Sequence, residues 1–158
     1  MHQSTVYFKN IVKEYTKGVR AVDNISCAFE PGSLTTLLGP SGCGKTTSLR
    51  LVAGLERATS GQIYIDDQDV TLLPATDRDV TMVFQSYALF PHMSVLENVS
   101  YGLKMAGIKK EEYHEKSIQT LKLIGLENFE LRMPSELSGG QQQRVAVARA
   151  IVLEPKVL

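Results

Sequence analysis

The sequence predicts an α/β fold in which a glycine-rich loop joins a buried strand to a helix. Residues 39–47 read Gly-Pro-Ser-Gly-Cys-Gly-Lys-Thr-Thr and match the pattern G-x-x-x-x-G-K-[ST] at every fixed position. The run before the loop, residues 34–38, is short, apolar and partly β-branched, as expected of a buried strand. Residues 46–53 have helical apolar spacing, and Gly54 gives the helix a C-terminal stop.

This order of elements is suited to binding phosphate. Glycines let successive backbone N–H groups point into one concavity, and the helix start adds a partial positive charge there. Lys45 is expected to reach the β- and γ-phosphates of a nucleotide, and the Thr46 hydroxyl to hold Mg²⁺. A chance glycine turn is disfavoured because motif and context agree. The expected phosphate-binding residues are Gly39, Pro40, Ser41, Gly42, Cys43, Gly44, Lys45, Thr46 and Thr47.

Composition narrows the possible partners. Seventeen basic and seventeen acidic residues balance, and no basic run stands out, which gives no support to nucleic-acid binding. No apolar run approaches the roughly 20 residues that span a bilayer, and the N-terminus lacks a signal-peptide pattern. Two cysteines, Cys27 and Cys43, form no disulfide framework and favour a reducing cytosol. Any role at a membrane is therefore expected to come through a partner.

Four further strands are predicted. Residues 5–11, 25–29 and 62–65 have strand-like composition, and a hairpin turn is expected at residues 66–67. A buried strand is expected over residues 80–84, and Gln85 follows it directly. Ligands of parallel α/β sheets bind outside the C-terminal ends of the strands, so we expect Gln85 near the nucleotide.

The character of the chain changes after Gln85. Residues 87–93 are apolar and aromatic but broken by Pro91, which disfavours a regular element. They read either as an exposed surface for a partner or as packing of a helical insert onto the core. Ser94 is expected to cap a helix that runs to about Met105, with Glu97 completing a capping box.

Two more helices are predicted downstream. One spans residues 109–124 and ends at Gly125, with one face formed by Tyr113, Ser117, Leu121 and Ile124. The other follows the sequence Leu-Ser-Gly-Gly-Gln at residues 137–141, and residues 145–153 are apolar almost all round, which indicates a buried helix. A serine and paired glycines at a helix start make a second candidate anion site.

These motifs resemble those of the ATP-binding cassette (ABC) family of transporter ATPases, and the resemblance covers the whole chain. Residues 39–46 are similar to the family's Walker A motif, Gln85 to its Q-loop, and residues 137–141 to its signature motif. The resemblance implies a P-loop NTPase core of the RecA-like type, with an N-terminal antiparallel β part and a helical subdomain insert.

The same resemblance implies a division of the chain into three parts. Residues 1–87 would form the nucleotide-binding core, residues 88–137 the helical subdomain, and residues 138–158 the signature helix and the return to the core.

In the family, two subunits pack head to tail around two ATP molecules, with Mg²⁺ as cofactor. The resemblance implies that Ser138, Gly139, Gly140 and Gln141 contact the ATP held by the phosphate loop of a second copy. It implies catalytic roles for Lys45 and for Gln85, which would reach Mg²⁺ and the attacking water. Tyr15 would stack on adenine, and the alternative is a ring packed on the surface, because one aromatic residue is a weak signal.

Residues 84–95 look like those of bacterial and archaeal importers for polyamines, ferric iron, sulfate, phosphonates or sugars. The resemblance implies a peripheral ATPase subunit at the cytoplasmic face of the membrane. It would contact permease subunits through residues 87–93, serve a solute-binding protein indirectly, and bind no nucleic acid. The alternatives are a soluble ABC-type ATPase acting on nucleic acid or ribosomes, a small-molecule P-loop kinase, and a non-catalytic nucleotide-binding module.

The sequence stops at Leu158, where the family's strand leading to the Walker B aspartate and catalytic glutamate begins. We therefore expect an N-terminal fragment of a longer subunit, with the C-terminal strands of the core missing. Such a fragment would bind phosphate but would lack hydrolysis on its own.

Overall fold

The structure, a computed structural model, describes residues 5–158 and forms two compact units. The first, called the sheet unit, holds residues 5–80 together with Val157. The second, called the helical unit, holds residues 81–156 together with Leu158. The three-part division expected from the sequence stays a prediction.

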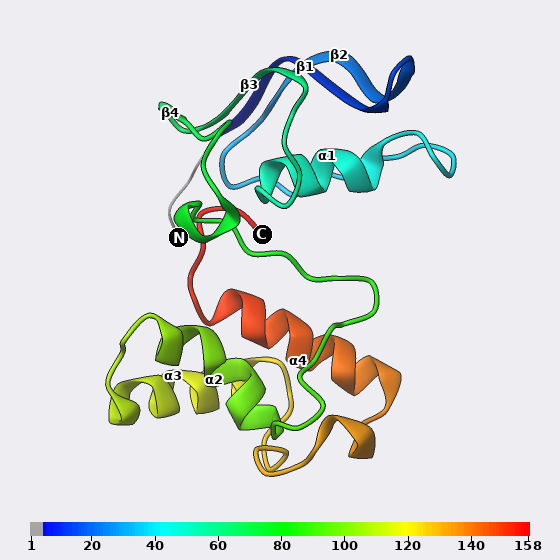
Figure 1. Ribbon diagram of the computed structural model, residues 1–158. Coiled ribbons are helices and arrows are strands. Elements are labelled where there is room, and N and C mark those ends of the chain that lie inside the picture. Colours follow the sequence, from blue (N-terminus) through cyan, green and yellow to red (C-terminus); the bar gives the residue numbers. More distant parts are fainter. Residues whose placement is uncertain (1–4) are drawn as a thin grey trace. The chain divides into compact units, whose positions relative to one another are not determined.

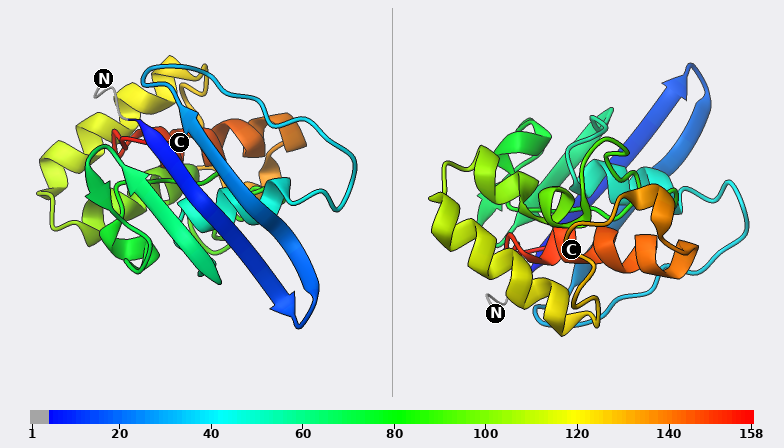
Figure 2. Two further views of the ribbon diagram at one scale, coloured as in Figure 1. Left: turned by 90° about the horizontal axis from the view of Figure 1, so that it is seen from above. Right: turned by 90° about the horizontal axis from the view of Figure 1, so that it is seen from below.

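The sheet unit is built on a four-stranded antiparallel sheet. Its spatial order is β2-β1-β3-β4, and the strands expected over residues 5–11, 25–29 and 62–65 are confirmed within it. Pairing of β1 with β3 ends at Val12 opposite Ser60, so β1 and β2 continue beyond β3 as a two-stranded ribbon (Figure 2). The strands are β1 (Val6–Thr16), β2 (Val19–Phe29), β3 (Ser60–Ile65) and β4 (Gln68–Asp69).

One face of this sheet is apolar because strand residues alternate between its two sides. Helix α1 (Lys45–Val52) lies along that face and buries Leu51 completely (Figure 1). It ends as predicted, with Gly54 in the left-handed region at φ 71°. The buried residues are Val6, Phe8, Ile11, Val22, Leu51, Ile63, Ile65 and Val70.

Arg78 joins the end of α1 to the segment that follows β4. Its buried guanidinium donates to the carbonyl oxygens of Leu51 (2.6 Å) and Val52 (2.9 Å). It also donates to Leu73 (3.0 Å) and Thr71 (3.2 Å). Burial lowers the pKa of Arg78, but a guanidinium remains protonated in proteins. Arg78 therefore acts as a cap for the helix end.

The helical unit contains α2 (Val95–Met105), α3 (Lys110–Leu123) and α4 (Gly139–Ile151) (Figure 1). All three helices were expected, and α4 is buried from Val145 onwards on most of its sides, as predicted. One-turn 3₁₀ helices lie at Ala75–Asp77 in the sheet unit and at Pro134–Glu136 here. The helical core consists of Val95, Val99, Leu103, Leu121, Leu126, Leu137, Val145, Ala148 and Val152.

The predicted capping box at the start of α2 is confirmed. Glu97 N donates to Ser94 Oγ (3.2 Å), and Ser94 N donates to Glu97 Oε2 (2.7 Å). The hydrogen bonds from Ser94 lower the pKa of the Glu97 carboxyl. In α3 the expected inner face is also confirmed, since Ser117 and Leu121 are buried and Tyr113 and Ile124 are half-buried.

Two expected strands do not form. Residues 34–38 belong to no strand, and Leu34 and Leu38 are 97% and 89% exposed. The run at 80–84 forms a single parallel bridge between Val80 and Val157, and Phe84 is 36% exposed. Both predictions are wrong because a buried strand needs neighbours along its edges. Within residues 5–158 no strand pairs with residues 34–38, and residues 80–84 make only the single bridge from Val80 to Val157.

Replacing Arg78 by methionine should destabilise the sheet unit by about 2–4 kcal/mol, because four carbonyls lose their donor in a buried place. Arg57→Met is the matched control, since the Arg57 side chain is exposed and should shift stability by roughly 0.5 kcal/mol or less. Urea unfolding followed by circular dichroism measures both. Equal losses in the two variants would contradict the capping role.

Candidate nucleotide-binding site

The glycine-rich loop contains glycines with left-handed backbone, which its expected role in phosphate binding would use. Gly42 and Gly44 have φ values of 81° and 91°, in the left-handed region that side chains avoid. Gly44 is also the N-cap of α1, and in the described structure no side chain caps that helix start. The N–H groups of Lys45, Thr46 and Thr47 are therefore left for a ligand or water.

Gly44 also lies close to the sheet. A Cβ atom added there would overlap the carbonyl oxygen of Ala21 and would lie 3.5 Å from Cγ2 of Val22 in β2. The residue must therefore be glycine for two reasons, its φ value and this close approach. Gly42 shares only the first of these reasons, because a Cβ added there would meet nothing within 4 Å.

The Lys45 side chain folds back over the loop. Its Nζ donates to the carbonyl oxygens of Gly39 (2.7 Å) and Pro40 (2.9 Å) and lies 3.5 Å from Sγ of Cys43. The ammonium is thus held at the loop by neutral acceptors. Ser41 and Thr46 are exposed at the same loop.

Tyr15 lies at the end of β1, on the ribbon that extends beyond β3. Its ring is 54% exposed, with Lys13 Nζ at 4.7 Å from the ring centroid. Lys13 pairs with Val22 across the ribbon, and Val22 lies beside Gly44 of the loop. The exposed ring is therefore carried by the strand pair that supports the phosphate loop.

The second predicted anion site is a well-formed helix start in the helical unit. Ser138 Oγ accepts from Gln141 N (3.3 Å), and Gln141 Oε1 accepts from Ser138 N (2.8 Å), which completes a capping box. Ser138, Gly139 and Gly140 are exposed. The N–H groups of the two glycines have no acceptor within the helix, and the Tyr87 hydroxyl would lie 3.9 Å from a Cβ atom added at Gly139.

Gln85 is exposed and begins a tight turn at the edge of the helical unit. Because the strand expected before it does not form, the structure provides no strand end to position it. The amide of Tyr87 donates to the carbonyl of Phe84 across this turn (2.9 Å).

Residues 87–93, called the connector, follow this turn. Ala88, Pro91 and His92 are exposed, whereas Tyr87, Leu89, Phe90 and Met93 are half-buried. Leu89 packs against the helical core. The connector thus combines the two interpretations drawn from the sequence, with part of it packed and part of it available to a partner.

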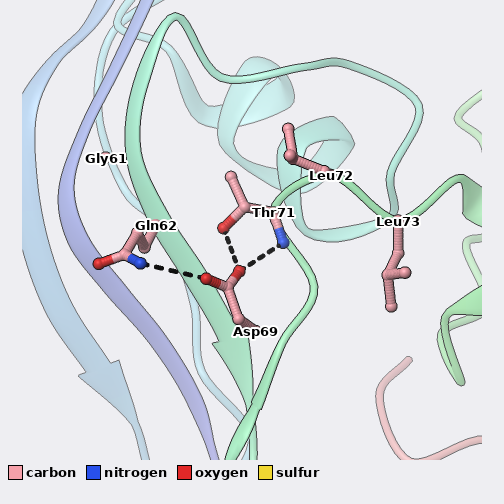
Figure 3. Close-up of a pocket in the computed structure, with 6 residues that line it drawn as sticks. All are labelled: Gly61, Gln62, Asp69, Thr71, Leu72 and Leu73. Atoms are coloured by element: carbon pink, nitrogen blue, oxygen red, sulfur yellow. Dashed lines mark hydrogen bonds between the residues drawn. The ribbon is translucent and has the colours of Figure 1, made fainter.

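A shallow pocket lies at the other end of the sheet unit, beside β3 and β4. Asp69 accepts from Thr71 N (2.9 Å), Thr71 Oγ1 (2.5 Å) and Gln62 Nε2 (3.1 Å), and these bonds, those from Thr71 first, lower the pKa of its carboxyl (Figure 3). None of the sequence-predicted site residues lines it. Since Asp69 is engaged within its own turn, this hollow is a structural feature of the hairpin.

The atoms around the loop that could bind a metal ion are uncharged oxygens. Within residues 5–158, no three His, Cys, Asp or Glu side chains gather where they could hold a metal ion. Mg²⁺ is commonly held by substrate phosphates and water together with one or two protein oxygens, so a hydroxyl such as that of Thr46 fits this pattern. In the same part of the chain, no helix is long and apolar enough to cross a membrane.

Gly44→Ala should unfold the loop, whereas Gly42→Ala should be tolerated. Both substitutions incur the left-handed strain of about 1–2 kcal/mol, but only the methyl group added at position 44 also collides with the Ala21 carbonyl. We expect Gly44→Ala to lose roughly 2 kcal/mol more than Gly42→Ala in urea unfolding. Similar losses would show that the approach to β2 is unimportant.

The chain is similar to known proteins over almost its whole length. The family model described as "ABC transporter" matches residues 22–158. The Fe(3+) ions import ATP-binding protein FbpC of Brucella abortus (strain 2308) is 62% identical over 154 residues, covering 98% of this chain and 43% of the relative. FbpC 1 of Haemophilus influenzae is 59% identical over 150 residues, covering 95% of this chain and 45% of the relative. The chain thus spans less than half the length of these relatives.

A solved structure, that of the ATP-binding cassette MJ0796 as a post-hydrolysis dimer bound to ADP and Pi, matches with a TM-score of 0.84 at 35% identity. The match covers 95% of this chain and 70% of that chain. It confirms the predicted α/β, P-loop NTPase fold class. Because the family match runs through both the phosphate loop and the start of α4, this chain belongs to the ABC transporter family.

Proposed function

We propose that this chain forms part of the ATP-binding subunit of an importer, which hydrolyses ATP in a head-to-tail dimer to drive solute uptake through permeases. The observation that carries the proposal is the presence of two glycine-bearing helix starts in one chain, one at Gly44 and one at Ser138-Gly139-Gly140. A helix start attracts anions, and one triphosphate held between two copies would use both. A solitary nucleotide-binding module would need only one of them.

On the phosphate-loop side, Lys45 would exchange its present hydrogen-bond acceptors, two backbone carbonyls, for a phosphate oxygen of ATP. Its ammonium donates to two neutral carbonyls, and a phosphate oxygen would form a stronger, charge-assisted bond. The uncapped N–H groups at the start of α1 would hold the remaining phosphate oxygens. Thr46 would hold Mg²⁺, and the exposed Tyr15 ring would stack on adenine.

On the opposite side, the partner copy would offer the start of α4. The exposed N–H groups of Gly139 and Gly140 and the Ser138 hydroxyl would face the γ-phosphate, with Gln141 beside them. Phosphoryl transfer depends mainly on positioning and on stabilising charge in the transition state. We propose that Gln85 contributes by reaching Mg²⁺ and the attacking water.

The relatives named as Fe(3+) import proteins make ferric iron the first cargo to test. In this proposal the permeases bind the exposed part of the connector, Ala88, Pro91 and His92, at the cytoplasmic face of the membrane. A solute-binding protein delivers the cargo to the permeases. The ATPase subunit itself is peripheral.

Lys45→Ala should raise the dissociation constant for Mg-ATP by about tenfold or more, because one charge-assisted phosphate bond is lost. Lys122→Ala is the control, since Lys122 is exposed in the last turn of α3. Titration calorimetry on the complete subunit measures both. Unchanged affinity in the Lys45 variant would remove the phosphate-binding assignment.

Ser138→Arg should leave ATP binding by the monomer intact but abolish ATP-driven dimerisation, because a long side chain would fill the space of the shared phosphate. The control is Ser135→Arg, which places the same side chain on an exposed serine of the preceding 3₁₀ turn. Light scattering after gel filtration, with and without ATP, reports the mass. Preserved dimerisation in the Ser138 variant would count against the head-to-tail arrangement.

A further inference from the structure

The side chain of Arg149, near the end of α4, binds backbone carbonyls of the connector. Nη1 donates to the carbonyl oxygen of Ala88 (2.9 Å), and Nη2 donates to that of Tyr87 (3.1 Å). The guanidinium carbon also lies 5.2 Å from the ring centroid of Phe90. One side chain thus holds three parts of the connector, two through hydrogen bonds and one through its ring.

The two residues whose carbonyls Arg149 binds have an unusual backbone conformation. Tyr87 and Ala88 have φ values of 62° and 48°, in the left-handed region that residues with side chains rarely adopt. Such a conformation persists only where surrounding contacts hold it. The two carbonyls bound by Arg149 belong to these same two residues, so the arginine supplies that constraint at the point where it is needed.

A second anchor fixes the far half of the connector. Asn98 of α2 is fully buried; its Oδ1 accepts from Phe90 N (2.8 Å), and its Nδ2 lies within hydrogen-bonding distance of the carbonyls of Phe90 (3.1 Å) and Met93 (3.0 Å). The ring of Phe90 also lies 4.8 Å from that of Tyr101 on α2. The connector is therefore a preformed part of the helical unit, tied to α2 at one end and to α4 at the other.

The residue type matters for this attachment. A guanidinium presents a planar fork that can donate to two acceptors at once, which a single ammonium does less well. Arg149 is half-buried, and burial lowers its pKa from the ordinary value. The free energy lost by desolvating the charge is offset by hydrogen bonds to carbonyls and by the Phe90 ring.

Helix α4 connects Arg149 to the candidate nucleotide site, because Ser138 lies at the start of the same helix. It runs over 13 residues, Gly139–Ile151, which corresponds to about 20 Å. Its first turn holds the exposed Ser138-Gly139-Gly140 corner, and Arg149 lies in its last turns. Because an α-helix is stiff over this length, a displacement of the connector at Arg149 would be passed along the helix axis.

We propose that Arg149 is a positioning residue that locks the connector to α4, so that movement of the connector by a partner moves the Ser138 helix start. This rests on the proposed function, in which the connector contacts the permeases and the helix start contacts ATP. Arg149 itself touches neither the nucleotide nor the partner in this mechanism. Its role is to make the connector and the helix respond together.

The test compares Arg149→Gln and Arg149→Lys with Arg144→Gln in the complete subunit assembled with its permeases. Arg144 is the matched control, because it lies on the same helix and also donates to two carbonyls, those of Ile124 (3.0 Å) and Gly125 (3.3 Å), away from the connector. The readout is solute taken up per ATP hydrolysed, together with the Mg-ATP affinity of the subunit without permeases.

We expect Arg149→Gln to lower uptake per ATP by about fivefold or more, with ATP affinity within about twofold of the wild type. Arg149→Lys should be intermediate, and Arg144→Gln should keep the wild-type ratio. A merely structural role would reduce uptake and hydrolysis together and leave the ratio unchanged. An unchanged ratio in Arg149→Gln overturns the proposal.

A second measurement covers the case in which Arg149→Gln does not fold. Hydrogen exchange of the Phe90 amide and its neighbours should be faster in Arg149→Lys than in Arg144→Gln. Equal exchange rates in the two variants would contradict the proposal that Arg149 holds the connector to α4. If the wild-type assembly itself neither binds nor hydrolyses ATP, the proposed function fails and this inference fails with it. If the wild type is coupled and only the Arg149 result disagrees, the inference fails alone.

Discussion

The close approach of Gly44 to the carbonyl of Ala21 is the constraint on which the sheet unit's candidate site depends. It places the phosphate loop directly against β2, and β2 is paired with the strand that carries Tyr15. It also fixes where α1 begins, because Gly44 is the N-cap of that helix. At the other end Arg78 holds the last carbonyls of α1, so the helix is secured at both termini by contacts that do not use its apolar face.

Features governed by local sequence could be predicted. The capping box at Ser94 was predicted because it needs only a serine and a Glu or Gln three residues later. Ser138 and Gln141 have the same spacing, although only the helix start was predicted there. The stops at Gly54 and Gly125 likewise follow from left-handed backbone that glycine tolerates. The residues of the candidate site could be named for the same reason, since a phosphate loop is a local motif whose chemistry resides in consecutive backbone groups.

Features that depend on distant partners could not be predicted. Residues 34–38 have the composition of a buried strand, but composition does not say which strand will pair with them, and Leu34 stays almost fully exposed. The roles of Arg149 and Arg78 were not predicted, because both side chains bind backbone carbonyls. Every residue has a carbonyl, so the sequence does not indicate which of them an arginine will bind. An arginine within an apolar run, as at Arg149, is the one signal that could have directed attention to the connector.

In the proposed shared site, the two helix starts would use one physical effect in two roles. At α1 the N-cap is a glycine without a side-chain acceptor, so the first N–H groups depend on a ligand or water. At α4 the Ser138 hydroxyl already satisfies the third N–H, and Gln141 satisfies that of Ser138. The start of α4 is therefore stable without a ligand and keeps fewer free donors for one. Such an asymmetry fits a site in which one helix start binds the triphosphate first and the other, already formed, closes on it afterwards.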